Sequence, residues 1–204
     1  MEDRSLTEAI DKVVRDCLYE TSKIHESVDY LNILGKTQPV GRRKDEGFII
    51  AGYPCIGKSS IFGMQYRIPI IDLESSNFNK DNRLWYIDYI KVAEHLAKQG
   101  FVVFVSTHSD VIQCLKNVSC KVFVICPHPN LQSFWIEKLQ SRYDKTKLDK
   151  DKRALERVVS FYKSDVDNLI KCGLPVVTIP IREYRLEDIV LSMFRNVQKI
   201  STET

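Results

Sequence analysis

The sequence predicts an α/β fold with a mostly parallel β-sheet that carries helices on both faces. Three observations predict it. From residue 47 onward, short runs rich in Val, Ile and Phe alternate with longer amphipathic stretches, an order typical of strand–helix–strand units. Most of these runs lack apolar–polar alternation, as expected for strands that are buried on both faces. Polar motifs follow directly after several runs, where ligands bind in sheets of this kind.

Five strands and six helices are expected in this part of the chain. The strands are expected at residues 48–51, 68–73, 101–106, 121–126 and 175–179. The helices are expected at residues 58–65, 82–99, 109–116, 131–143, 150–171 and 186–197. Asp81 is suited to cap the start of the second helix and Gly100 to end it, because Asp favours N-cap positions and Gly favours the left-handed position after a helix.

Residues 1–46 differ from the rest and are expected to form a helical extension and a linker. Ser5 and Glu8 have the spacing of a capping box, and apolar residues follow at helical spacing up to Leu31. A stretch at residues 35–47 with Gly, Pro and a run of charges then predicts the linker. The domain itself is expected to span residues 47–204.

The composition narrows the function classes. The 204 residues suit one α/β domain, and 44% of them are apolar and can build its core. A net charge of +3 and a sequence pI near 8.4 are compatible with anionic small substrates and too weak to indicate nucleic-acid binding. The six cysteines lack metal-site spacing, and no apolar run resembles a signal peptide or a membrane span, so a reduced, cytoplasmic protein is expected.

The strongest motif is GYPCIGKS at residues 52–59, which follows the first expected strand. It has the pattern Gly-x-x-x-x-Gly-Lys-Ser. The glycines allow backbone N–H groups to turn toward phosphate oxygens, Lys58 supplies a charge to the β and γ phosphates, and Ser59 offers a hydroxyl to Mg²⁺. We therefore expect ATP and Mg²⁺ as cofactors. The residues expected to contact the nucleotide are Gly52, Tyr53, Pro54, Cys55, Ile56, Gly57, Lys58, Ser59 and Ser60.

Carboxylates follow the second and third expected strands. Asp72 and Glu74, with Ser75 next to them, could hold Mg²⁺ or the substrate and orient the hydroxyl that accepts a phosphoryl group. They could equally form a turn or a helix cap. The third strand ends in STHSD, where His108 could act as a base and Asp110 could serve the metal or cap the next helix. The magnesium ligand is therefore undecided between Asp72 and Asp110.

The stretch at residues 138–157 is dense in Lys and Arg and is expected to form a lid at about residues 140–157. A phosphoryl-transfer enzyme needs cations that close over the phosphates, and Arg is suited to this by its planar guanidinium. Arg142, Arg153 and Arg157 are the candidates. The other interpretation is a solvated helical pair with mixed surface charges.

Aromatic residues gather near the start of the helix expected at 82–99. Trp85, Tyr86 and Tyr89 could form a wall of the acceptor site, where an aromatic ring can stack on a nucleotide base. A helical stripe of aromatic residues can instead belong to the hydrophobic core.

With the loop, the acidic strand end and the basic stretch in this order, residues 47–200 resemble the nucleoside-monophosphate-kinase-like group of P-loop proteins, which includes guanylate, adenylate, shikimate and gluconate kinases. GYPCIGKS is the specific part of the resemblance, and IIDLESS and FVICPHP…WIEKLQSRY are weaker parts. Gly-Tyr-Pro-x-x-Gly-Lys-Ser followed by Ile-Asp-Leu also resembles phage and bacterial nucleotide-kinase-like proteins.

This resemblance implies a three-layer P-loop NTPase fold with a mobile lid, in which five parallel strands have the order 2-3-1-4-5. It also implies that Arg142 and Arg182 lie near the nucleotide, that Arg153 or Arg157 reaches the transferred phosphoryl group, and that Asp72 serves the metal or the substrate. The chain departs from the group at the end of the third strand, which lacks the metal-directed aspartate of many P-loop proteins.

The expected function is that of an ATP-dependent phosphotransferase acting on a small molecule, first of all a (deoxy)nucleoside monophosphate. Its partners would be a nucleotide triphosphate and the phosphate acceptor, without a membrane. A kinase for a nucleic-acid hydroxyl is one alternative, suggested by the basic linker and lid. A nucleotide-binding switch or ATPase module is another, suggested by the missing aspartate, with residues 1–46 as a partner-binding helix.

Overall fold

The computed structural model describes residues 47–58, 61, 69–180 and 183–202. The expected helical extension at 1–46 lies outside the described residues, and so does most of the helix expected at 58–65. Ser59, Ser60 and Arg182, three of the expected nucleotide contacts, lie outside them as well.

The described chain is an α/β structure with one five-stranded sheet in the order β2-β3-β1-β4-β5. All four strand pairs are parallel, which confirms the parallel sheet expected from the sequence pattern and the strand order implied by the resemblance. The strands are β1 (Phe48–Gly52), β2 (Ile70–Asp72), β3 (Val102–Val105), β4 (Lys121–Pro127) and β5 (Val176–Ile179). β1 lies in the centre and is buried over its whole length, because every residue in it is apolar or Gly and has a helix layer on each side.

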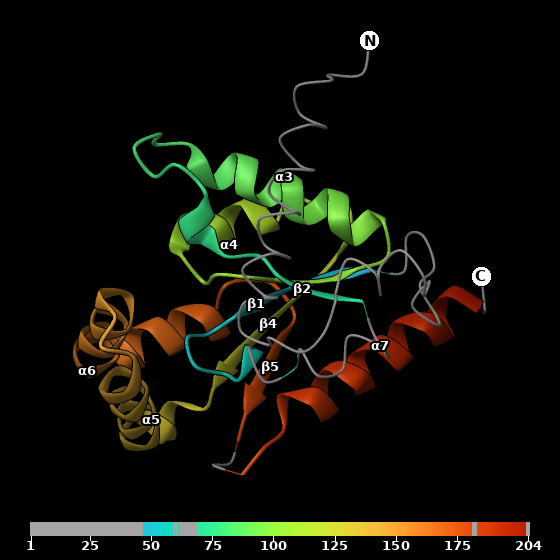
Figure 1. Cartoon of the computed structure of the whole chain (residues 1–204). Helices are drawn as coiled ribbons and strands as arrows, with labels where there is room; N and C mark the ends of the chain where they lie inside the picture. The colour runs from blue at the N-terminus through green and yellow to red at the C-terminus, as the bar shows by residue number, and fades with distance from the viewer. Residues whose placement is uncertain (1–46, 59–60, 62–68, 181–182, 203–204) are drawn as a thin grey trace, which may run out of the picture.

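Helices α3 and α4 cover one face of the sheet, and α7 lies on the other (Figure 1). α5 and α6 form a helical hairpin after β4, on the side of the molecule where β1 and β4 end (Figure 1). The α-helices are α3 (Trp85–Lys98), α4 (Ser109–Leu115), α5 (Gln132–Thr146), α6 (Asp149–Ile170) and α7 (Leu186–Thr202). Two short 3₁₀ helices, η2 (Ser75–Asn77) and η3 (Pro129–Leu131), follow β2 and β4.

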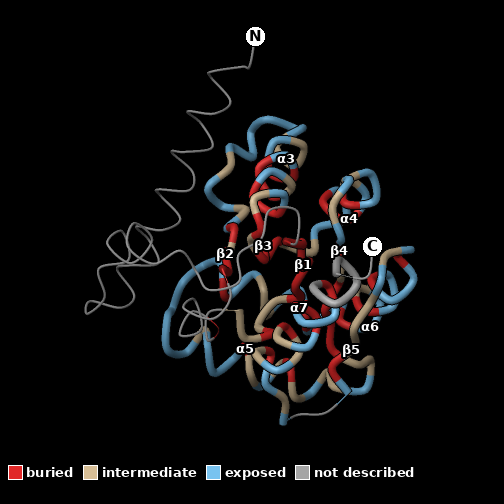
Figure 2. The backbone as a smooth tube through the Cα atoms, turned by 90° about the vertical axis from the view of Figure 1, so that its right-hand side faces the viewer, coloured by how far each residue is buried: buried red, intermediate tan, exposed pale blue. Residues whose placement is uncertain are grey.

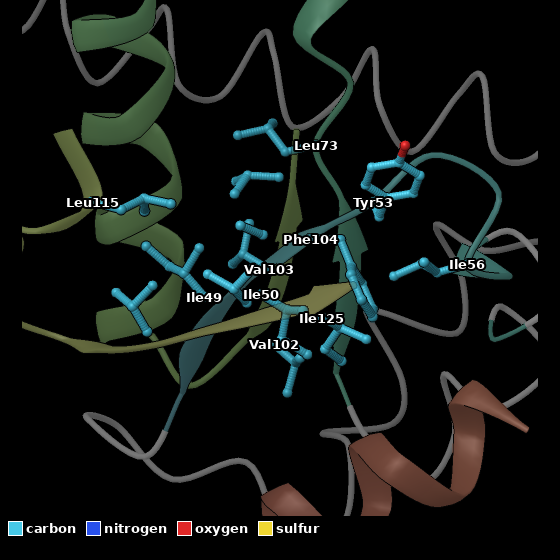
Figure 3. Close-up of a cluster of buried hydrophobic side chains, with 14 of the residues drawn as sticks. Ile49, Ile50, Tyr53, Ile56, Leu73, Val102, Val103, Phe104, Leu115 and Ile125 are labelled. Atoms are coloured by element: carbon cyan, nitrogen blue, oxygen red, sulfur yellow. The ribbon is translucent and has the colours of Figure 1, made fainter. Parts of the chain in front are cut away.

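The core lies between the sheet and these helices, and Figure 2 shows the strands and the inward sides of the helices as buried. Side chains alternate between the two faces of each strand. On the α7 face, Phe48 packs against Phe123 and Phe194, with ring centroids 5.5 and 6.5 Å away. On the other face, Ile49 and Val103 lie toward Leu115 of α4 (Figure 3). The sheet is thus covered on both sides, as the uninterrupted apolar runs predict.

Helix α3 begins at Trp85, three residues later than predicted, and Asp81 does not cap it. The side-chain oxygens of Asn79 and Asn82 accept hydrogen bonds from the backbone N–H groups of Asp81 and Leu84, both at 3.0 Å. These two turns compete with the first helical turn, which delays the helix. The helix ends as predicted before Gly100, whose φ of 91° lies in the left-handed region that favours glycine.

Candidate functional site

The loop that follows β1 turns sharply at the carboxyl end of the central strand. Its backbone enters the left-handed region at Cys55 (φ 62°) and takes a positive φ again at Gly57 (φ 99°). The N–H group of Tyr53 donates to the Ile125 carbonyl of β4 at 3.0 Å, and that of Ile56 donates to the Tyr53 carbonyl at 3.3 Å. The loop is therefore tied to the end of β4 and closed by a turn of its own.

Two loop carbonyls are held from outside by aromatic donors. The indole N–H of Trp135 donates to the Pro54 carbonyl at 2.8 Å, and the hydroxyl of Tyr184 donates to the Ile56 carbonyl at 2.9 Å. The two rings are stacked, with centroids 6.1 Å apart, and the Lys138 ammonium lies 5.0 Å from each centroid and donates to the Tyr184 hydroxyl. We call Trp135, Lys138 and Tyr184 the aromatic anchor.

The aromatic anchor sets the direction of the loop amides. None of the described peptide bonds is cis, and in a trans peptide the C=O and the following N–H point in opposite directions. Because the carbonyls of Pro54 and Ile56 point to the anchor, the N–H groups of Cys55 and Gly57 point away from it. Backbone N–H groups presented in this way are suited to binding an anion.

Lys58 reaches across the start of this loop to β2. Its ammonium nitrogen lies 3.5 Å from Asp72 Oδ1, and its side chain passes over Gly52. A Cβ atom at Gly52 would lie 3.3 Å from Lys58 Cδ and 2.7 Å from Ile56 Cδ1. Glycine at position 52 therefore leaves room for the side chains of Ile56 and Lys58, which a Cβ atom at this position would crowd.

Asp72 ends β2 with a side chain that is only 13% exposed. Its Oδ1 atom is buried, and among the described residues its partner is the Lys58 ammonium at 3.5 Å, an ion pair at the long limit of hydrogen-bond distance. Burial raises the pKa of Asp72, opposed chiefly by the charge of Lys58, while the negative charge of Glu74 adds to the rise and the charge of Arg142 opposes it. The positive charges of Lys58 and Arg142 thus partly offset the effect of burial on the pKa of Asp72.

The ends of β2 and β3 are joined by Tyr89 of α3. Its buried hydroxyl donates to the Leu73 carbonyl at 2.7 Å and accepts from the Ser106 N–H at 2.9 Å. The structure thus uses the polar end of Tyr89 to fix the two strand ends to each other. Ser106 Oγ is itself buried and has no partner in the described part of the chain. Asp110 is exposed in the first turn of α4.

Trp85 and His108, two of the predicted substrate residues, lie in contact. Their ring centroids are 5.7 Å apart, and the Lys80 ammonium lies 5.0 Å from the centroid of the Trp85 indole. Although His108 has exposed surface, partial desolvation lowers the pKa of its imidazole, and the charges of Lys80 and Arg157 lower it further. Glu74 is exposed, and Ser75 Oγ lies 3.5 Å from Lys80. An aromatic surface edged with positive charge therefore lies near the ends of β2 and β3.

Of the three candidate arginines, Arg142 is the one that contacts the loop. It donates to Cys55 Sγ at 3.6 Å and forms an ion pair with Asp151 Oδ1 at 2.9 Å. Asp151, in the first turn of α6, is 2% exposed and also accepts from the Thr146 hydroxyl at 2.6 Å. A buried carboxylate thus holds Arg142 between the helical hairpin and the loop.

Arg157 and Arg153 lie further along α6. Arg157 forms a bidentate pair with Asp165, with distances of 2.7 and 2.9 Å. Arg153 is exposed, and no carboxylate of the described residues forms an ion pair with it. In this arrangement neither arginine contacts the loop, so the structure does not bring them to it as it does Arg142.

One face of α5 lines an open cavity of about 600 Å³. Three cationic side chains and one acidic side chain belong to this face, and Arg142 connects it to the loop. The described lining residues are Phe134, Glu137, Lys138, Ser141, Arg142, Lys145 and Thr146. The excess of positive charge beside the loop favours an anionic ligand.

No family model, curated protein or solved structure matches this chain. Among the described residues, no group of three or more His, Cys, Asp or Glu side chains is arranged to hold a metal ion, and the cysteines are free thiols. No helix in the described ranges is long and apolar enough to cross a membrane. The function must therefore be inferred from the site itself.

Sequence reasoning missed residues that shape this site. Trp135 and Tyr184 lie 81 and 128 residues from the loop carbonyls they bind, and Asp151 was one acid among many in a charged stretch. Ser106 could have been recognised as a candidate from the sequence, because it directly follows a buried strand at the position where many P-loop proteins carry an aspartate. A polar residue that directly follows such a strand is a site candidate whatever its type.

Proposed function

We propose that this chain is an ATP-dependent phosphotransferase of the P-loop, nucleoside-monophosphate-kinase-like type, with a nucleoside monophosphate as acceptor. The observation that carries this proposal is the placement of Lys58. Its side chain passes over Gly52 and brings the ammonium to 3.5 Å from the buried Asp72 carboxylate. In the adjacent loop, two backbone carbonyls accept hydrogen bonds from the aromatic anchor and so point away from this ammonium. A cation in this position, next to outward-pointing amides, suits a polyphosphate chain.

Magnesium fits the residues present. Asp72 provides a carboxylate oxygen without a hydrogen-bond partner among the described residues, beside the lysine expected to bind phosphate. Mg²⁺ is commonly bound by one or two carboxylates together with substrate phosphates and keeps several waters, so a cluster of three acidic side chains is not needed. When bound, the ion would neutralise charge on the β and γ phosphates. Ser59, next to Lys58 in the motif, would add a hydroxyl.

The cations of the site have separate tasks in this proposal. Lys58 exchanges its contact with Asp72 for the phosphates of ATP. Arg142, held by Asp151 next to Cys55, adds charge from the side of the helical hairpin, where negative charge develops as the phosphoryl group moves. Arg153 and Arg157 would act only after the hairpin moves toward the loop.

The contact of Trp85 with His108 supports a nucleotide as the acceptor. An indole ring suits stacking on a base, and the Lys80 ammonium, which lies over the Trp85 ring, would move to the phosphate of a bound monophosphate and free the ring face. Asp72 would orient the accepting oxygen or its metal.

The test is phosphate transfer from labelled ATP, with Mg²⁺, to a panel of nucleoside monophosphates and small hydroxylated metabolites. We expect transfer to one class of acceptor and its loss in Lys58→Ala, because the amides alone cannot neutralise the transferred phosphoryl group. Lys98→Ala is the matched control, since Lys98 pairs with Glu94 on the exposed side of α3. Undiminished transfer by Lys58→Ala would refute the proposal.

The same panel, together with a polynucleotide-binding measurement at several salt concentrations, separates the alternatives. A nucleotide-binding switch or ATPase module would bind ATP and transfer phosphate to none of the acceptors. A kinase for nucleic-acid hydroxyls would bind polynucleotides with an affinity that falls steeply with salt.

A further inference from the structure

Two buried oxygen atoms at the ends of neighbouring strands have unused hydrogen-bonding capacity, although one of them, Asp72 Oδ1, is ion-paired with Lys58. Asp72 Oδ1 ends β2, Ser106 Oγ directly follows β3, and neither has a hydrogen-bond partner among the described residues. Leaving such an atom unpaired is unfavourable, and buried polar groups in native proteins are nearly always satisfied. Two of them on adjacent strand ends indicate that a ligand completes this position.

The sheet register places both side chains on the same face. Asp72 pairs with Phe104 in the β2–β3 ladder, and Ser106 lies two residues after Phe104, so the alternation of a strand turns both to one side. Ile50 of β1 also pairs with Phe104, and Gly52 follows Ile50 by two residues. The two oxygens and the start of the phosphate loop therefore share this face, and Phe104 lies with Ile56 of the loop on one side of the sheet (Figure 3).

The position is also rigid. Tyr89 binds the Leu73 carbonyl and the Ser106 N–H with one hydroxyl, which fixes the separation of the two strand ends. The Leu73 N–H donates to the Phe104 carbonyl at 2.9 Å and extends the ladder past Asp72. A preorganised pair of oxygen acceptors is what a hydrated cation requires, because its waters donate hydrogen bonds in fixed directions.

We propose that Asp72 and Ser106 together hold the hydration shell of the Mg²⁺ that accompanies the nucleotide, with Ser106 standing at the strand end where an aspartate was expected. This inference rests on the proposed function. Asp72 would accept hydrogen bonds from metal-bound water or bind the ion directly, and the Ser106 hydroxyl would accept from a second water. Lys58, 3.5 Å from Asp72, places the β and γ phosphates next to both groups.

This arrangement predicts the order in which the metal and the nucleotide bind. A single carboxylate already paired with Lys58 binds Mg²⁺ weakly, so the metal should bind only with the phosphates, which supply its remaining ligands. Mg²⁺ alone should therefore leave the protein unchanged, whereas nucleotide and Mg²⁺ should each tighten the binding of the other by the same factor.

The test is calorimetry of a non-hydrolysable ATP analogue, with Mg²⁺ and with EDTA, on the full chain. We expect Mg²⁺ to tighten binding to the unaltered chain, and we expect this gain to fall about tenfold or more in Asp72→Asn and about threefold to tenfold in Ser106→Ala, the size of one lost neutral hydrogen bond. In EDTA, Asp72→Asn should bind at least as tightly as the unaltered chain, because Lys58 loses its competing partner.

Two variants make the result specific. Ser106→Thr keeps the hydroxyl and should keep the gain from Mg²⁺. Asp110→Asn removes the other candidate carboxylate, which is exposed in the first turn of α4, and should leave the gain unchanged. Thermal melts followed by circular dichroism check that each variant is folded.

The failures of the two proposals can be told apart. If the unaltered chain binds the analogue in neither buffer, the proposed function is wrong and this inference is wrong with it. If the chain binds the analogue and Asp72→Asn keeps the full gain from Mg²⁺, or Asp110→Asn loses it, only the inference is overturned.

Discussion

Replacing Tyr184 by Phe removes one oxygen atom from the aromatic anchor and leaves its ring in place. That oxygen donates to the Ile56 carbonyl at 2.9 Å and accepts from the Lys138 ammonium at 3.1 Å. Burial raises the pKa of Tyr184, so the hydroxyl keeps its proton throughout the neutral range. The substitution therefore tests whether a hydrogen bond from a distant residue shapes the loop.

The expected loss of stability can be worked out from these contacts. A neutral hydrogen bond contributes about 1 kcal/mol, and a buried carbonyl left without a donor costs about 1–3 kcal/mol. Ile56 is buried, whereas Lys138 is only partly buried and can bind water instead. We expect the free energy of unfolding to fall by about 2 kcal/mol, which lowers the Tm of a domain of this size by about 4–8 °C.

The nucleotide binding that we propose should weaken as well. If the lost hydrogen bond lets the loop turn its amides away, the fraction of chains with a binding-competent loop falls, and the apparent Kd rises by the inverse of that fraction. A shift of about 1.4 kcal/mol toward other loop conformations weakens binding about tenfold. The whole 2 kcal/mol sets an upper limit of about thirtyfold.

The assay combines a thermal melt with calorimetry of an ATP analogue and Mg²⁺. Tyr143→Phe is the control, since Tyr143 lies on α5 with its ring beneath Lys147 and outside the anchor. It should change stability by less than about 0.5 kcal/mol, as surface substitutions usually do. If Tyr184→Phe is destabilised and yet binds the analogue as tightly as the unaltered chain, the anchor supports the fold without shaping the loop, and our reasoning about the amides is wrong.

Two further predictions concern charges. The hydrogen bonds from Ser119, with a smaller contribution from Lys98, lower the pKa of Glu94 to about 2. A carboxylate whose pKa is lowered by folding stabilises the fold at pH values above its pKa in the unfolded chain, and this stabilisation is lost as the pH falls toward 2. In urea unfolding, Glu94→Gln should therefore cost about 1 kcal/mol at pH 7, after allowance for solvent screening, and almost nothing near pH 2. Arg142→Met leaves the Asp151 carboxylate buried with the Thr146 hydroxyl as its remaining donor and should cost about 2–3 kcal/mol, more than Asp151→Asn, which removes the buried charge; equal melting temperatures for the two variants would contradict this order.

Much of the fold could be predicted because its signals are local. The run at residues 48–51 is apolar without interruption, which indicates a strand covered on both sides, and β1 lies at the centre of the sheet. Gly100 marks the end of α3 because the left-handed conformation favours glycine. The start of α3 was missed because Asn79 and Asn82 bind nearby N–H groups, and such local competition is hard to weigh from spacing alone.

The placement of Lys58 near Asp72 could be predicted from the motif and the strand ends, whereas contacts between distant parts of the chain could not be predicted. Lys58 and Asp72 were expected to serve one ligand, and the structure places them 3.5 Å apart. Tyr89 was expected to face a substrate, and the structure shows its hydroxyl bound to two strand ends. Periodicity could place Tyr89 on the inward side of its helix, but it could not show which backbone groups lie opposite.

The loop motif provides the residue types, and contacts with the rest of the chain determine the directions in which the loop's backbone amides point. A glycine-rich turn can adopt many conformations, so the pattern at residues 52–59 does not by itself fix where its amides point. Here two carbonyls are bound from α5 and from the segment before α7, and the peptide plane then sets the opposite direction for the following N–H groups. Because Trp135 and Tyr184 also stack on each other, a change in either ring disturbs both carbonyls. Their effects on nucleotide affinity should therefore be non-additive in a double-mutant cycle, as expected for residues that act as one unit.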